Sequence, residues 1–248
     1  MDNDILQLKN NFIDISNMGW IKSMRGGSTG IGYTFEYYLG KSEDNFFLPD
    51  YNGIEIKTHR SYSNSSFTLF NVSPDGESFF EIERLYNLYG HRGKNCSNSK
   101  VLNNSVVCSK KTCVGLKYKF SLDFSDAKQR VYLNVYDRNN VFVENNSYWT
   151  YSLLKERLFL KYDILAIVFA DSKFVGGFEY FKYSCIKFYK IKSFDSFIEA
   201  IKKDKICITF KIGTFKSGKR VGQIHDHGTG FCINYSDIDY VFDVIDYF

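Results

Sequence analysis

Hydrophobic and polar residues along the chain follow two spacings, one typical of strands and one typical of helices. Alternating apolar and polar positions predict strands buried on one face. A continuous apolar run, as in 163–171, is typical of a strand buried on both faces. The ranges predicted as strands are 53–59, 66–72, 131–137, 163–171, 180–191, 205–213 and 231–235.

Helical spacing occurs in four further segments: 29–39, 78–89, 150–160 and 194–203. Thr29 is a candidate N-cap of the first, and Gly40 and Gly90 are expected to stop the first and second helices. Residues 217–231 are predicted to form a Gly-rich basic loop. The order of elements predicts a mixed α/β fold (α+β) with helices on both sides of a central sheet.

The composition limits the classes of protein to which the chain can belong. With 248 residues, 44% hydrophobic and 18% aromatic, the chain can bury the core of one large domain or of two lobes. No apolar run is long enough to span a membrane, and the first residues lack the pattern of a signal peptide. None of the six cysteines forms a C-x-x-C pair, so we expect free thiols in a reducing cytoplasm.

The net charge of +4 permits nucleic-acid binding without requiring it, so the distribution of charge matters more. Residues 84–122 contain several Lys and Arg residues but no Asp or Glu. Two interpretations stay open: a solvated, mobile surface segment, or a loop that faces phosphates.

The segment "PDYNGIEIKTHR", residues 49–60, concentrates the candidate chemistry. Side chains alternate across a strand, so Glu55 and Lys57 share one face while the isoleucines beside them can be buried on the other. A bend at the turn-prone "YNG" would bring Asp50 beside Glu55. Two carboxylates and the carbonyl of Ile56 form an oxygen-only site that suits Mg²⁺.

A divalent ion at such a site would lower the pKa of a water and stabilise charge on a phosphate, and Lys57 would contact the same phosphate or the attacking water. The pattern therefore predicts phosphodiester hydrolysis. Its alternative is an exposed strand edge with ordinary surface charges. Glu36, on the preceding predicted helix, is a candidate third carboxylate.

His225 and His227 flank Asp226 in the motif "HDHG". Three interpretations are open: a metal site with a cysteine as third ligand, a polar turn, or a base-reading loop in which imidazole donates to guanine and Asp226 accepts from cytosine. The basic residues just upstream are candidate phosphate contacts: Lys216, Lys219 and Arg220.

Two further residues have open roles. His59 shares the strand face of Glu55 and Lys57, as a proton relay, a DNA contact or an exposed strand-end residue. Arg25 precedes the glycine-rich "GGSTGIG", which lacks the Lys-Ser/Thr ending of a P-loop, so its glycines favour close approach of the backbone to DNA. Arg25 is then a phosphate contact or an ordinary surface arginine.

In order and separation, "TGIGYTFEYYLG", "PDYNGIEIKTHR" and "SGKRVGQIHDHGTGF" resemble the MvaI/BcnI family of type II restriction endonucleases, within the PD-(D/E)xK nuclease superfamily and related to the mismatch-repair nickase MutH. "SYW" before a predicted helix and "FEYFKYS" after the central strand extend the resemblance over most of the chain. Each motif alone is weak, and the three together are specific.

The resemblance implies a site-specific DNA endonuclease that uses Mg²⁺, for which Mn²⁺ substitutes, and that works as a monomer. It implies a PD-(D/E)xK core, a central mixed sheet flanked by helices, with a second DNA-recognition lobe. We expect a catalytic lobe of about 1–75 with 148–190, and a recognition lobe of about 76–147 with 191–248. The expected partners are double-stranded DNA and, unbound but in the same bacterial system, a cognate DNA methyltransferase.

By the same resemblance, Asp50, Glu55 and Lys57 match the catalytic triad, with Ile56 completing the metal ligands, and Glu36 matches the helix glutamate of the superfamily. The implied DNA-binding residues are Arg25, His59, Lys211, Lys216, Lys219, Arg220, His225, Asp226, His227 and Thr229. The family has arginines near Lys211 and Cys232. Lysine binds guanine less specifically than the bidentate guanidinium of arginine, and cysteine does not form this contact. The family's short C/G-rich recognition sites are therefore not carried over to this chain.

Two alternatives to a restriction enzyme stay open. One is a MutH-like nicking endonuclease that depends on partner proteins. The other is a non-cleaving DNA-binding module with a vestigial site, against which the intact triad argues.

Overall fold

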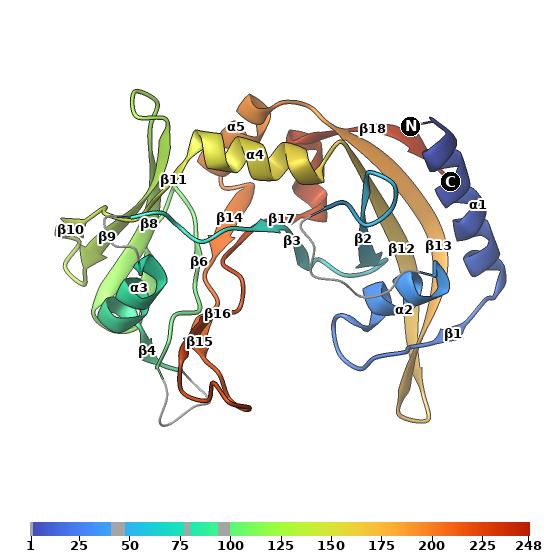
Figure 1. The fold of residues 1–248 in the computed structure, drawn as a ribbon, viewed down its shortest axis with the longest axis horizontal. Helices are drawn as coiled ribbons and strands as arrows, with labels where there is room; N and C mark the ends of the chain where they lie inside the picture. Colours follow the sequence, from blue (N-terminus) through green and yellow to red (C-terminus); the bar gives the residue numbers. More distant parts are fainter. Residues whose placement is uncertain (1, 41–47, 77–79, 94–99) are drawn as a thin grey trace. The chain divides into compact units, whose positions relative to one another are not determined.

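The computed structural model describes residues 2–40, 48–76, 80–93 and 100–248 and contains two compact units (Figure 1). Unit 1 comprises Met1–Ser65, Phe159–Ser193 and Val241–Phe248. Unit 2 comprises Ser66–Leu158 and Phe194–Tyr240. Each unit is built around its own sheets, and the mixed α+β class predicted from the sequence is confirmed.

Unit 1 is built on one mixed sheet with the strand order β1-β13-β12-β2, in which β18 pairs with β13. Strands β2 and β12 run parallel, and the other neighbours are antiparallel. The strands are β1 (Ile21–Lys22), β2 (Ile54–Arg60), β12 (Ile164–Val175), β13 (Phe178–Ile191) and β18 (Phe242–Tyr247). Strand β2 therefore lies at one edge of the sheet. Its unpaired edge is open to the residues that precede it in the chain.

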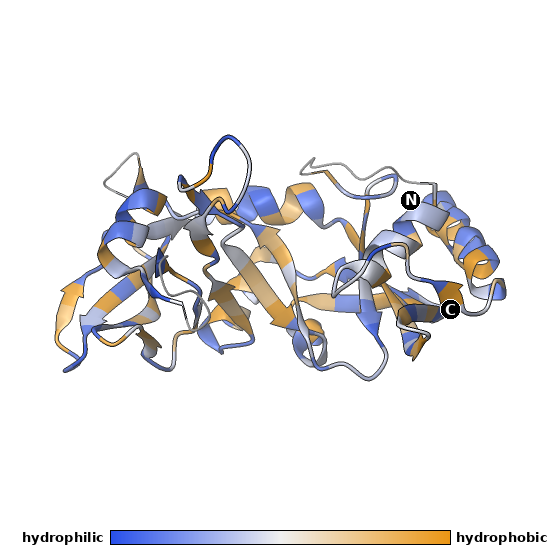
Figure 2. Cartoon of the chain, turned by 90° about the horizontal axis from the view of Figure 1, so that it is seen from below, coloured by the Kyte–Doolittle hydropathy of each residue, from blue (hydrophilic) through white to orange (hydrophobic). Residues whose placement is uncertain are grey.

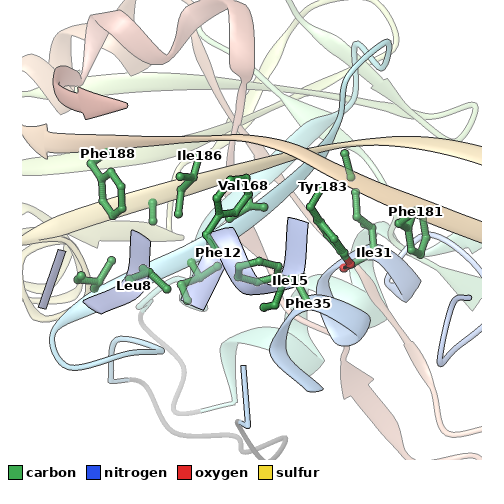
Figure 3. Close-up of a cluster of buried hydrophobic side chains, with 14 of the residues drawn as sticks. Leu8, Phe12, Ile15, Ile31, Phe35, Val168, Phe181, Tyr183, Ile186 and Phe188 are labelled. Atoms are coloured by element: carbon green, nitrogen blue, oxygen red, sulfur yellow. Dashed lines mark hydrogen bonds between the residues drawn. The ribbon is translucent and has the colours of Figure 1, made fainter. Parts of the chain in front are cut away.

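Helices α1 (Asp2–Asn17) and α2 (Gly30–Tyr38) bury their apolar sides against this sheet. Apolar residues three or four positions apart place one stripe of each helix toward the strands. Each large side chain removed from water contributes about 1.5–3 kcal/mol. The side chains labelled in Figure 3 are Leu8, Phe12, Ile15, Ile31, Phe35, Val168, Phe181, Tyr183, Ile186 and Phe188.

Unit 2 contains two larger sheets and two short hairpins. One sheet has the order β10-β9-β8-β7 with β11 beside β9: β7 (Thr112–Val114), β8 (Tyr118–Ser125), β9 (Arg130–Asp137), β10 (Phe142–Glu144) and β11 (Tyr148–Thr150). The other has the order β3-β17-β14-β6: β3 (Ser66–Asn71), β6 (Ser105–Val106), β14 (Ile206–Thr209) and β17 (Gly230–Asn234). The hairpins pair β4 (His91–Arg92) with β5 (Lys100–Val101), and β15 (Ile212–Thr214) with β16 (Ile224–Asp226).

The remaining helices are α3 (Glu81–Tyr89), α4 (Tyr151–Lys161), α5 (Phe194–Lys202) and the 3₁₀ helix η1 (Tyr235–Tyr240). Figure 2 shows hydrophobic and hydrophilic residues alternating along helices and strands, as expected for elements buried on one side. No helix among the described residues is long and apolar enough to cross a membrane. The five described cysteines are free thiols, and Cys96 lies outside the described residues.

Local signals in the sequence are confirmed at several element ends. Thr29 occupies the N-cap of α2, although its side chain makes no capping hydrogen bond. Gly40 follows α2 with φ +77°, and Gly90 is the C-cap of α3. The first of these conformations is one that glycine adopts without a steric penalty.

Two predictions are wrong. The basic segment 84–122 is not a single loop where it is described: it runs from α3 through the four short strands β4 to β7 into β8, and the Arg84 guanidinium binds the carboxylates of Glu81 and Glu144. Lys94 lies outside the described residues. The expected strand 205–213 is two strands in different sheets, because the backbone at Phe210 and Ile212 bonds to Asn104 and Leu102 instead.

Candidate active site

Strand β2 separates its apolar and charged side chains as the alternation predicts. Ile54 and Ile56 are 2% and 3% exposed and belong to the core under α1 and α2. Glu55, Lys57 and His59 occupy the opposite face. Strand β2 is an edge strand, but the interpretation of its charges as ordinary surface charges is wrong, because Glu55 is 0% exposed.

A tight bend brings Asp50 back to the strand. Tyr51 and Ile54 exchange two backbone hydrogen bonds of 2.9 and 2.7 Å, and the residues between them, Asn52 and Gly53, have φ of +44° and +86°. An Asn-Gly pair with both φ positive is the usual two-residue hairpin turn. The Asp50 carboxylate then accepts a hydrogen bond from the Ile56 N–H at 3.0 Å.

That hydrogen bond also locates the carbonyl of Ile56. In an extended strand the N–H and the C=O of one residue point to the same side. Since the Ile56 N–H points to Asp50, its carbonyl oxygen points to the same open edge of β2. The bend thus collects the oxygens of Asp50 and Ile56 at this edge, next to Glu55 in the strand.

Glu55 is held by two ammonium groups. Its Oε1 lies 2.5 Å from Lys57 Nζ and 3.0 Å from Lys161 Nζ, at the end of α4. Burial raises the pKa of Glu55 and the negative charge of Asp50 adds to it, while Lys57 and, less strongly, Lys161 lower it. The fully buried Tyr162 has its pKa raised by burial and by the same two carboxylates. The site therefore carries paired, desolvated charges.

The second carboxylate oxygen of Glu55 is not engaged by either lysine. Oε2 is buried and has no hydrogen-bond partner among the described residues. An unpaired buried carboxylate oxygen is costly unless another ligand satisfies it. The two carboxylates and one carbonyl fit a divalent cation such as Mg²⁺, which keeps several waters and takes substrate phosphate oxygens. Within the described part of the chain, no cluster of three or more His, Cys, Asp or Glu residues could hold a metal by itself.

Three other candidates lie around this strand. The Glu36 carboxylate lies near Gly32 and Thr58. His59 is only 6% exposed and packs on Phe169 with 5.8 Å between ring centroids, so the prediction of an exposed strand-end residue is wrong. The guanidinium of Arg25 lies 4.0 Å over the Tyr33 ring, which fixes it before the glycine-rich segment.

Lys161 is not among the site residues that the sequence predicts. Its only local signal is a basic residue in the last turn of a helix. The parallel register of β12 with β2, which pairs Ile164 with Ile54, is what brings it to Glu55. That pairing is long-range, so residue spacing cannot predict it.

In unit 2, the hairpin β15–β16 presents a stack of rings. His225 lies parallel to Phe215 at 4.1 Å and edge-on to His227 at 4.4 Å. The Arg220 guanidinium covers the Phe215 ring at 4.3 Å. The stack restrains these side chains on a short hairpin whose connecting residues 216–223 are exposed.

Asp226 makes contacts within the protein. Its Oδ2 accepts a hydrogen bond from Ser73 Oγ at 3.0 Å, and its Oδ1 accepts one from the Gly228 N–H at 2.9 Å. This is the geometry of the polar turn, so both carboxylate oxygens already have partners. Thr229 is 1% exposed, whereas the basic residues of this region are exposed: Lys211, Lys216, Lys219 and Arg220.

The sequence profile of the MvaI/BcnI restriction endonuclease family matches residues 9–242. The chain belongs to this family. As a member of the MvaI/BcnI restriction endonuclease family it is a site-specific deoxyribonuclease, and the resemblance noted from its motifs is confirmed. No curated protein matches the chain.

Two solved structures are similar to this family member over nearly its whole length. One is the restriction endonuclease MvaI–cognate DNA substrate complex, with 33% identity, 99% of this chain and 100% of that chain covered, and a TM-score of 0.89. The other is restriction endonuclease MvaI in the absence of DNA, with 32% identity, coverage of 99% and 98%, and a TM-score of 0.64.

Proposed function

We propose that this chain hydrolyses phosphodiester bonds of double-stranded DNA at a short specific sequence, with the active site in unit 1 and sequence recognition in unit 2. The observation that carries the proposal is the face of β2, where Glu55 and Lys57 lie side by side and Asp50 bends back to the same edge. The similarity to MvaI, whose solved structure contains its cognate DNA substrate, supports duplex DNA as the partner.

For the cofactor we propose Mg²⁺, with Mn²⁺ as a substitute, held by Asp50, Glu55 and the carbonyl of Ile56. When bound, the ion would lower the pKa of a water molecule and stabilise charge on the phosphate. Lys57 would then orient the attacking water and neutralise charge on the phosphate. The partnerless Oε2 of Glu55 supports this ligand set.

Four further residues support the proposed site. Lys161 shares Oε1 of Glu55 with Lys57, so it holds the carboxylate when Lys57 turns to the phosphate. Glu36 acts as an auxiliary carboxylate from α2, and His59 supports the strand from its buried position against Phe169. Arg25 contacts a phosphate from the segment before α2.

For recognition we propose that His225 and His227 read base edges from the stacked hairpin, while Asp226 shapes the loop through its two hydrogen bonds. Thr229 supports the loop from beneath, since it is buried. The exposed basic residues contact phosphates: Lys211, Lys216, Lys219 and Arg220. We further propose that one chain acts alone, in the cytoplasm, beside a DNA methyltransferase of the same system.

The test is digestion of unmethylated phage or plasmid DNA in Mg²⁺ by the purified chain, beside a Lys57→Ala variant, followed by sequencing of the ends. Discrete fragments that share a short motif are expected from the wild-type chain and not from the variant. Equal cleavage by Lys57→Ala would contradict the proposed active site. Plasmid that is nicked and never linearised over a time course would instead identify a nicking enzyme.

A further inference from the structure

Strands β12 and β13 continue beyond the rest of the unit 1 sheet as a long hairpin, whose tip lies at the lower right of Figure 1. Its turn is Gly176–Gly177, with φ of +58° and +82°. The end of the hairpin is exposed and rich in aromatic and basic residues. We propose that one face of this hairpin binds the duplex that flanks the cleaved phosphate, an inference that rests on the proposed function.

The register assigns this face to the same side of the sheet as the active site. Directly paired residues share a face, and Leu165, Ile167 and Phe169 of β12 pair with Glu55, Lys57 and His59. The alternate residues of β12 belong to the core under α1 and α2: Ile164, Ala166, Val168 and Ala170. The register of β12 with β13 shifts between Phe169 and Ala170, but beyond the shift Ala170 and its partner Tyr183 still belong to the core, so Asp171, Lys173 and Val175 lie on the active-site side.

Their partners in the neighbouring strands extend the same face. Lys182, Tyr180 and Phe178 of β13 pair with Asp171, Lys173 and Val175, and Lys22 of β1 pairs with Tyr180. Two cation–π contacts tie the strands together: Lys22 Nζ lies 3.4 Å from the Phe178 ring centroid, and Lys173 Nζ lies 4.0 Å from that of Trp20. We call this set the hairpin face: Trp20, Lys22, Asp171, Lys173, Val175, Phe178, Tyr180 and Lys182.

The chemistry of the hairpin face suits a duplex backbone. Its three lysines are exposed, and Phe178 and Trp20 are 53% and 40% exposed. Of the two acidic residues in β12 and β13, Asp171 belongs to this face and pairs with Lys182, whereas Glu179 lies on the other side, where both of its carboxylate oxygens bind Arg60. Lysines held over aromatic rings keep their positive charge in a fixed place, which favours contact with phosphates over contact with an apolar partner.

The distance agrees with flanking DNA. Six residues of strand separate Ile167, the partner of Lys57, from Lys173, which corresponds to about 20 Å along the strand, and Val175 lies about 26 Å away. At 3.4 Å per base pair these spans correspond to about six to eight base pairs from the cleaved phosphate. The hairpin face would therefore contact backbone outside a short recognition sequence.

The first test compares binding to two duplexes that carry the cleaved sequence, with about eight or about two base pairs of flank. Binding is measured in Ca²⁺ without Mg²⁺. A variant with Lys22→Gln, Lys173→Gln and Lys182→Gln keeps the side-chain stems and removes three charges. We expect the wild-type chain to bind the longer duplex about tenfold more tightly than the shorter one, and the variant to lose this preference.

On the longer duplex, the slope of log affinity against log salt should fall by two to three units in the variant, at about 0.9 per lost phosphate contact. Single substitutions provide the matched control. Lys173→Gln should lower the slope by about one, whereas Lys190→Gln should not, because Lys190 is exposed and pairs with Ile164 on the opposite side of the sheet. An unchanged slope in the triple variant would overturn the inference.

A second measurement uses the unaltered chain. It has two tryptophans, of which Trp20 is 40% exposed and Trp149 is 0% exposed, so iodide should quench Trp20 alone. The longer duplex should protect Trp20 from quenching and the shorter should not, and equal quenching with both duplexes contradicts the inference. Failure of the proposed function would appear differently, as no cleavage of either duplex in Mg²⁺.

Discussion

The bend between Asp50 and β2 offers a sharp test, because one glycine sets it. Gly53 has φ +86°, and a Cβ built on it meets nothing within 4 Å. Gly53→Ala therefore adds no clash and changes only the backbone energy. Holding an L-residue in the left-handed region costs about 1–2 kcal/mol. That cost favours an open bend, in which Asp50 no longer lies beside Ile56.

A bias of about 1–2 kcal/mol corresponds to a fivefold to thirtyfold change in an equilibrium constant. If Asp50 is a metal ligand, the Mg²⁺ concentration for half-maximal cleavage should rise by about that factor. The maximal rate should recover at saturating Mg²⁺, because metal binding restores the bend. Cleavage rates measured across a Mg²⁺ titration give both quantities.

Gly19→Ala is the matched control. Gly19 follows α1 in the same unit, has φ +72° and also has open space where the Cβ would lie. It should lose similar stability in thermal unfolding and keep the Mg²⁺ requirement of the wild-type chain. The reasoning is refuted if Gly53→Ala and Gly19→Ala have the same Mg²⁺ requirement.

Three further predictions concern the charges around both sites. Lys161→Ala should slow cleavage about tenfold, about 1.4 kcal/mol, because Glu55 loses one of its two ammonium partners, while Lys155→Ala on the same helix should not. Because burial raises the pKa of Glu55, cleavage at limiting Mg²⁺ should rise with pH through a midpoint above the usual carboxyl range. Since Lys161 lowers the pKa of Glu55, Lys161→Ala should move the midpoint of the pH–rate profile upward. Asp226→Ala should loosen the loop by about 1–3 kcal/mol and reduce discrimination between the cleaved sequence and its single-base variants in competition digests.

Local chemistry made much of the active-site geometry predictable. The alternation in "GIEIKTH" places Glu55 and Lys57 on one face, and the Asn-Gly pair explains how Asp50 returns to them. These relations involve residues within one short segment, so spacing and turn preferences suffice. Lys161 belongs to the same site but reaches it through a parallel pairing more than a hundred residues away in sequence.

Elsewhere the local signal was weak or was not used. Helix α1 was not predicted from the sequence. Its apolar residues Ile5, Leu8, Phe12 and Ile15 nevertheless follow a regular helical spacing. Strands β4 to β7 have only two or three residues each, too few for any periodicity. The break at Phe210 contains no Gly or Pro and follows from bonds to Asn104 and Leu102, which only the fold creates.

The central claim is that Asp50 and Glu55 hold the metal that the reaction needs. Anomalous scattering from Mn²⁺ in crystals of the chain with its DNA tests this directly. A single strong peak between the Asp50 carboxylate and Oε2 of Glu55, lost in Asp50→Asn, is the predicted result. A metal bound elsewhere, or none between these two carboxylates with DNA in place, would contradict the account.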